Sequence, residues 1–163
     1  MPPYAELHCI SNFSFLKGAS HPEEMVERAK TLGYRAIAIT DECSFAGIVR
    51  AHVAAQAVDI QLLIGSEFRL QEGTRFILIA KNRSGYGYIA NLISTARRRA
   101  PKGDYYLSHK DFVETESNCI AVWLPNAEAL QEIRAKEIDW LKNYFENQVW
   151  IGVNQLLINH ESR

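Results

Sequence analysis

The amino-acid sequence predicts an α/β domain with a mainly parallel β-sheet or barrel. Short apolar segments typical of strands alternate with longer amphipathic segments typical of helices, which indicates βαβ units. The segment AIAIT at 36–40 is apolar along its whole length, as expected of a strand that is buried on both faces of a parallel sheet. With 163 residues, of which 47% are hydrophobic and 23% charged, the chain fits one globular domain.

The N-terminal part predicts a strand, a polar loop and a helix. Residues 5–10, AELHCI, form the strand, and the serines, asparagine and glycine that follow predict a loop. The helix is expected over 20–34. Ser20 and Glu23 can form an S-x-x-E capping box at its start, and Gly33 is a typical helix end.

The middle part predicts a second helix and a hairpin. The strand at 36–40 leads into a helix over 45–58, and QLLIGSEFRL at 61–70 predicts a third strand. TRFILIA at 74–80 predicts a fourth strand, paired with the third across the turn QEG at 71–73.

The C-terminal part predicts two more helices and two more strands. We expect a helix over 84–99, a strand over 119–124, a long helix over 126–147 and a last strand over 149–157. Because no helix follows the last strand, we expect that a longer α/β domain has been cut. The apolar face of the long helix is predicted to consist of Leu130, Ile133, Leu141 and Phe145.

Charge and cysteine content exclude several classes of protein. The net charge of −1 gives no general attraction to nucleic acid or to an anionic membrane, so a contact with DNA would need a local patch. No apolar segment approaches the length of a membrane span, and the N-terminus has no secretion signal pattern. The three cysteines, Cys9, Cys43 and Cys119, are widely spaced, which favours reduced thiols and a cytoplasmic location over a disulfide framework.

Polar side chains gather at the carboxyl ends of the first three predicted strands. His8 ends the first strand, Asp41 and Glu42 follow the second, and Glu67 lies in the third. In parallel α/β folds these ends converge, so one histidine and three carboxylates could bind Zn²⁺, Mn²⁺ or Mg²⁺ and activate a water for hydrolysis. Alternatively, His8 is a hydrogen-bonded core residue and Asp41 caps the helix that begins near residue 44.

Four stretches of the sequence together resemble a known family. ELHCISNFSFLKGAS, AIAITDECSFAGIVRAH, LLIGSEFRL and LIAKNRSGYGYIANLISTARRRAPKGDY are similar to the PHP (polymerase and histidinol phosphatase) domain that opens bacterial C-family DNA polymerase III alpha subunits. TDECS and SNFSFLKGASHPEE are most similar to the error-prone branch, and the resemblance runs from Tyr4 to about Leu157. It implies a distorted (β/α)₇ barrel, incomplete here with about six strands, in which 1–163 is a single PHP segment at the N-terminus of a longer polymerase.

The resemblance also implies a metal site that is degenerate. His8, Asp41 and Glu67 match the family's first histidine, its aspartate and its glutamate, whereas Ile10 and Glu42 stand where active members carry histidines. Isoleucine cannot coordinate a metal, and glutamate favours harder cations than Zn²⁺. The matching set would therefore hold one divalent ion weakly or none.

The function that the resemblance implies is indirect. The polymerase active site, which uses aspartates and Mg²⁺, would lie outside these residues, and the segment would act as a structural module of the polymerase. Its partners would be the remainder of that chain, DNA through the polymerase, the sliding clamp and an accessory mutagenesis protein. The alternatives are a surviving metal-dependent phosphoesterase or 3′–5′ proofreading nuclease, and a stand-alone binding module.

A basic cluster follows the predicted helix at 84–99. It consists of Arg97, Arg98, Arg99 and Lys102. These cations could contact a DNA backbone, since phosphate contacts need charge but no sequence readout. The alternative, which we favour, is that they stabilise the carboxyl end of the helix through its dipole and free carbonyls.

Overall fold

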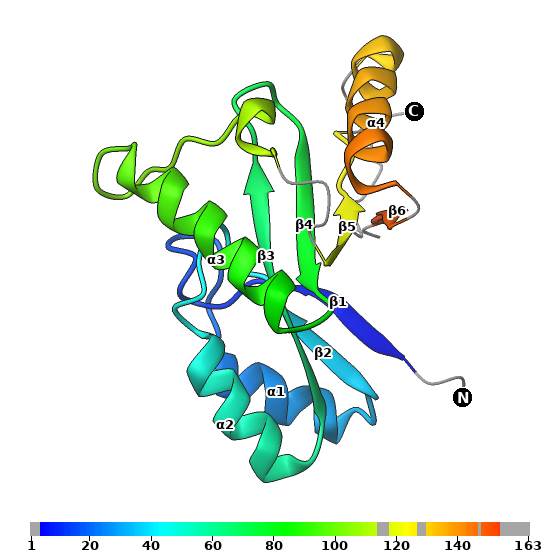
Figure 1. The fold of residues 1–163 in the computed structure, drawn as a ribbon. Coiled ribbons are helices and arrows are strands. Elements are labelled where there is room, and N and C mark those ends of the chain that lie inside the picture. The colour runs from blue at the N-terminus through cyan, green and yellow to red at the C-terminus, as the bar shows by residue number, and fades with distance from the viewer. Residues whose placement is uncertain (1–3, 114–117, 127–129, 147, 154–163) are drawn as a thin grey trace, which may run out of the picture.

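The six strands form one curled sheet in the order β1-β2-β3-β4-β5-β6 (Figure 1). The computed structural model of the protein describes residues 4–113, 118–126, 130–146 and 148–153. The elements in chain order are β1 (Ala5–Cys9), α1 (Pro22–Thr31), β2 (Ala36–Ile39), α2 (Ile48–Val58), β3 (Gln61–Arg69), β4 (Arg75–Ala80), α3 (Arg83–Arg98), the short 3₁₀ helix η1 (His109–Asp111), β5 (Cys119–Trp123), α4 (Gln131–Phe145) and β6 (Val149–Ile151).

Strand β4 is the only one of these six that runs against the others. The pairs β1–β2, β2–β3 and β5–β6 are parallel, and β4 is antiparallel to both β3 and β5. Strand β3 joins two parts of the sheet, because 61–64 pair with β2 and 65–69 pair with β4. The predicted mainly parallel α/β fold and the predicted hairpin are confirmed, and the open curled sheet is consistent with an incomplete barrel (Figure 1).

Helices cover one face of the sheet. Helices α1 and α2 pack on each other and on β2 and β3, whereas α3 packs on β3 and β4, and α4 on β5 and β6 (Figure 1). Alternation along the strands determines which residues meet the helices, because successive side chains point to opposite faces. In β4, Phe76 and Leu78 join a core with Ile89 of α3 and Leu141 of α4.

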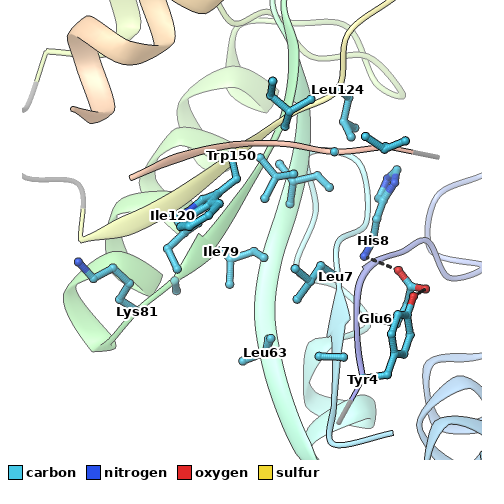
Figure 2. A pocket seen from close by; sticks show the side chains of 17 residues that line it. Tyr4, Glu6, Leu7, His8, Leu63, Ile79, Lys81, Ile120, Leu124 and Trp150 are labelled. Atoms are coloured by element: carbon cyan, nitrogen blue, oxygen red, sulfur yellow. Dashed lines mark hydrogen bonds between the residues drawn. The ribbon is translucent and has the colours of Figure 1, made fainter. Parts of the chain in front are cut away.

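The opposite face of the sheet carries an apolar cluster of its own. Ile77 and Ile79 of β4 pack there with Val122 of β5 and with Leu124 just beyond it. All the hydrophobic side chains of this cluster come from strands or strand ends. This face therefore forms the inner surface of the curled sheet and borders the cavity shown in Figure 2.

The N-cap of helix α1 lies one residue later than predicted. His21, and not Ser20, is the N-cap residue, and its backbone N–H donates to Glu24 Oε2 at 2.8 Å. The physical reason is Pro22 at the first helical position, which forces the preceding residue into an extended conformation. The predicted box between Ser20 and Glu23 was therefore wrong by one residue.

The C-terminal elements are shorter than predicted. Helix α4 begins at Gln131 rather than at 126, and β6 ends at Ile151, while 154–157 of the predicted strand lie outside the described residues. On α4, Leu141 and Phe145 are buried as expected, but Leu130 and Ile133 are exposed. The first turn of the helix extends beyond the sheet that its later turns cover.

Candidate metal centre

The four predicted ligands lie at the ends of the first three strands, and the structure brings the side chains of His8 and Glu67 into contact. His8 lies in β1, Asp41 and Glu42 follow β2 directly, and Glu67 lies in β3. An isolated parallel bridge pairs Glu42 with Glu67, and His8 Nε2 lies 2.8 Å from Glu67 Oε2. The convergence of the strand ends thus places His8 beside Glu67, whereas a metal site at these residues stays a prediction.

The carboxylate of Glu67 binds a cation supplied by the protein itself. Arg75 Nε donates to Oε1 at 2.6 Å and Arg75 Nη2 donates to Oε2 at 3.0 Å, so the guanidinium holds both oxygens. His8 Nε2 donates to Oε2 as well. Glu67 is fully buried, and a buried carboxylate requires such paired donors.

The hydrogen bonds to Glu67 decide its charge. Burial alone would raise the pKa of Glu67, but the hydrogen bonds from His8 and Arg75 outweigh it and lower the pKa from 4.5 to about 2. The same contact raises the pKa of Arg75. Near pH 7 the pair is therefore a carboxylate and a guanidinium that both keep their charges.

Asp41 anchors the loop that follows β1. Its Oδ1 accepts hydrogen bonds from the Ser11 backbone N–H at 2.8 Å and from Ser14 Oγ at 2.7 Å, and its Oδ2 accepts one from Ser11 Oγ at 2.7 Å. The side chain is 1% exposed. Asp41 does not cap α2, which was the alternative expectation, because the N-cap residue of α2 is Gly47.

Glu42 is held by one cation and one phenol. Its Oε2 forms an ion pair with Lys17, and its Oε1 accepts a hydrogen bond from Tyr105 Oη at 2.9 Å. Burial, together with the negative charge of Glu42, raises the pKa of Tyr105, so the phenol keeps its proton and remains a donor.

These contacts fit a metal ion poorly. Each oxygen of Asp41, Glu42 and Glu67 already accepts at least one hydrogen bond, and His8 uses Nε2 as a donor. A metal ligand must direct a free lone pair at the ion, and these bonds occupy both lone pairs of Asp41 Oδ1 and Glu67 Oε2 and one of the two on each other oxygen. Within the described ranges, no group of three or more His, Cys, Asp or Glu side chains is arranged to hold a metal ion.

Arg97 of the basic cluster is a structural clamp. Its guanidinium donates to the carbonyls of Glu42 and Cys43 at 3.1 Å each, and to the carbonyls of Gly103 and Asp104. It thereby ties the end of α3 to the loop after β2, where the buried Cys43 adopts a positive φ of 46°.

The other basic residues remain near the surface. Arg98 Nε donates to the Ser94 carbonyl at 3.3 Å, Arg99 forms an ion pair with Asp111, and Lys102 is exposed. One of these bonds, from Arg98 to Ser94, goes to a carbonyl of α3, so both the helix-end alternative and a contact of this cluster with DNA stay predictions.

Sequence reasoning missed the partners of the carboxylates. Arg75 is the first residue of β4, two residues before Ile77, so its side chain lies on the same face as Ile77 and Ile79. An inward-facing charge was therefore visible in the sequence pattern. Ser14 and Tyr105 left no such pattern, because their contacts depend on how two loops fold.

An apolar cavity of about 690 Å³ lies beside His8 on the inner face of the sheet. Figure 2 shows Leu7, Leu63 and Ile79 near its floor and His8 at its edge, with Trp150 of β6 on the far side. Its lining is mainly apolar, and its polar side chains, Tyr4, Glu6, His8 and Lys81, lie among these apolar residues.

The fold and the strand-end residues agree with a family match. The PHP domain profile matches residues 6–155, and the chain therefore belongs to the PHP domain family. The predicted resemblance is confirmed. Among curated proteins, the chain is homologous to error-prone DNA polymerases.

Two of these relatives show how far the similarity extends. The error-prone DNA polymerase of Methylococcus capsulatus is 49% identical over 156 residues, and that of Pseudomonas aeruginosa is 46% identical over 153 residues. Each match covers 94% of this chain but only 14% of the relative. The chain thus corresponds to a small N-terminal region of much longer proteins.

Solved structures share the fold at low sequence identity. An amidohydrolase from Chromobacterium violaceum is 14% identical with a TM-score of 0.70, and the match covers 89% of this chain and 75% of that one. A protein described as a metal-dependent phosphoesterase from Bifidobacterium adolescentis is 18% identical with a TM-score of 0.61, and the match covers 86% of this chain and 75% of that one.

In the described part of this chain, no helix is long and apolar enough to cross a bilayer.

Proposed function

We propose that residues 1–163 form the N-terminal PHP domain of an error-prone DNA polymerase and serve its structure rather than a hydrolytic reaction. The identity of 45 to 49% to such polymerases over most of the chain supports the first part. The hydrogen bonds of Arg75 and His8 to Glu67 support the structural role, since they engage a carboxylate that a hydrolytic metal site would need as a ligand.

The polymerase reaction itself lies outside these residues in this proposal. Nucleotidyl transfer and its Mg²⁺ ions belong to a later part of the chain, and DNA, the sliding clamp and an accessory mutagenesis protein are partners of the whole polymerase. The location is the cytoplasm. The contribution of this domain is a stable platform on which the rest of the polymerase packs.

The strand-end site is degenerate in this proposal because protein cations replace metal ions. A divalent ion at Glu67 would have to displace the guanidinium of Arg75, whose charge cannot be removed near neutral pH. At Glu42 it would have to displace Lys17. Each displacement costs an existing ion pair, so the site holds a Zn²⁺, Mn²⁺ or Mg²⁺ ion weakly or not at all.

A second candidate function is a surviving metal-dependent phosphoesterase or 3′–5′ nuclease. It is favoured by the shared fold with a phosphoesterase and by the contact of His8 with the carboxylate of Glu67. It requires that these side chains rearrange when metal is supplied.

Hydrolysis assays separate the two candidates. The purified protein is incubated with p-nitrophenyl phosphate or with 3′-labelled DNA in Mn²⁺, Zn²⁺ or Mg²⁺, beside its Glu67→Gln variant. Gln keeps the shape of the side chain but removes the charge that a metal needs. We expect both proteins to give the rate of the buffer blank. A rate above the blank that is lost in Glu67→Gln would contradict the structural function.

A further inference from the structure

The loop between β1 and α1 exposes two large apolar side chains at its tip. Phe15 is 85% exposed and Leu16 is 89% exposed, which makes Leu16 the most exposed large hydrophobic residue in the described part of the chain. Leu16 also has a positive φ of 61°, a conformation that costs free energy for a residue with a side chain. The protein therefore holds an apolar tip in water at a local energetic cost.

The tip is held by a rigid loop rather than by a loose one. Ser11 and Ser14 donate their hydroxyls to the buried Asp41, and the backbone N–H groups of Lys17 and Gly18 both donate to the Ser14 carbonyl. At Gly18 a Cβ atom would lie 2.1 Å from the Ser11 carbonyl oxygen, so the loop closes tightly on itself. A preorganised tip loses little conformational entropy when it binds.

The charges at the tip favour a protein partner over nucleic acid. Lys17, the cation next to Leu16, is already paired with Glu42 and is not free to neutralise a phosphate. Phe15 and Leu16 instead offer an apolar anchor that would fill a pocket on a protein surface. Because the chain spans only 14 to 16% of the polymerases that it matches, a large protein surface belongs to the same chain in those relatives.

We infer that the tip of the 11–18 loop, Phe15 and Leu16, docks into an apolar pocket on the part of the polymerase that lies outside residues 1–163. This inference rests on the proposed function. Asp41, which matches a metal ligand of the family, then has a different role, because it fixes Ser11 and Ser14 and so positions the docking tip.

Hydroxyl-radical footprinting of the full polymerase chain tests the docking. Leu32 at the end of α1 is a matched control, because it is a leucine that is 49% exposed and lies outside the loop. If the tip were free, Leu16 would be oxidised faster than Leu32. Docking that buries Leu16 as fully as a core residue brings its exposed fraction from 89% to well below the 49% of Leu32, so that Leu16 becomes the more slowly oxidised of the two. Leu16 oxidised at least as fast as Leu32 would overturn the inference.

Footprinting with added DNA and at lower protein concentration identifies what covers Phe15 and Leu16. Protection of Leu16 that appears only when primer–template DNA is added would overturn the inference in favour of nucleic acid, and protection that is lost on dilution would overturn it in favour of a second copy. Primer extension by the same preparation shows whether the chain is part of a polymerase. An active polymerase with an unprotected Leu16 therefore contradicts the docking alone.

Substitutions provide an independent readout on the full chain. We expect Phe15→Ser with Leu16→Ser to lower the melting temperature of the polymerase, because the docked contact is lost. The control Leu32→Ser should leave it unchanged. Equal melting temperatures for the double variant and the unmodified polymerase would overturn the inference.

Discussion

Replacing Arg75 by methionine should destabilise the domain, because it leaves the buried carboxylate of Glu67 with His8 as its remaining side-chain donor. Breaking a buried ion pair costs about 3–5 kcal/mol, and we expect about 2–3 kcal/mol here because 36% of the Arg75 side chain is exposed and solvent screens it. The fall of the Glu67 pKa from 4.5 to about 2 corresponds to about 3 kcal/mol, shared between His8 and Arg75.

The assay is urea unfolding at pH 7, carried out as a double-mutant cycle. The proteins are the unmodified chain, Arg75→Met, Glu67→Gln and the double variant, and the cycle isolates the interaction between the two side chains. Arg69→Met is the matched control, since Arg69 lies directly opposite Arg75 on β3 and is exposed. The control should change the free energy of unfolding by less than about 0.5 kcal/mol.

The interaction energy from the double-mutant cycle decides whether Arg75 and Glu67 are coupled. We expect an interaction energy of at least about 1.5 kcal/mol between Arg75 and Glu67, as for other directly contacting pairs. A value below about 0.5 kcal/mol would mean that the two side chains act independently. The idea that a protein cation occupies this carboxylate would then be refuted.

Three other substitution and pH effects follow from the same contacts. The pKa of Glu67 is about 2 in the folded state and 4.5 when unperturbed, so its stabilisation of about 3 kcal/mol should be present above pH 4.5 and lost as the pH falls toward 2. Urea unfolding midpoints measured against pH should show this loss in the unmodified chain and not in Glu67→Gln. Arg97→Ala removes four bonds to carbonyls and should cost about 2 kcal/mol in urea unfolding, whereas Arg98→Ala should cost less than about 0.5 kcal/mol; equal losses would contradict the clamp. Ser14→Ala removes a donor from the buried Asp41 and should cost about 1–3 kcal/mol by the same assay, and a neutral result would show that Asp41 does not depend on the loop.

Much of the fold followed from local patterns in the sequence. The apolar runs at 36–40 and 76–80 predicted β2 and β4 correctly, because burial on both faces of a sheet imposes such runs directly. Element ends were less predictable. Pro22 placed the N-cap of α1 at His21 rather than Ser20, and the apolar residues Leu130 and Ile133 at the start of α4 are exposed.

The site was predictable in position but not in chemistry. His8, Asp41 and Glu67 were found because strand ends converge, which is a property of the topology. Their partners depend on tertiary detail that spacing does not encode. Arg75 reaches Glu67 through the register of the β3–β4 hairpin, and Ser14 reaches Asp41 through the fold of a loop. The sequence therefore indicated which carboxylates lie at the strand ends, but not which groups bind them.

The metal content of the purified chain tests the central claim most directly. The protein is dialysed against trace Zn²⁺ and Mn²⁺ and measured by elemental analysis, beside Glu67→Gln and beside Ile10→His with Glu42→His, which restores the histidines of the family pattern. If protein cations replace metal ions, the unmodified chain holds well below one equivalent and Glu67→Gln changes nothing, while the histidine variant gains metal. One or more equivalents in the unmodified chain, lost in Glu67→Gln, would contradict the claim.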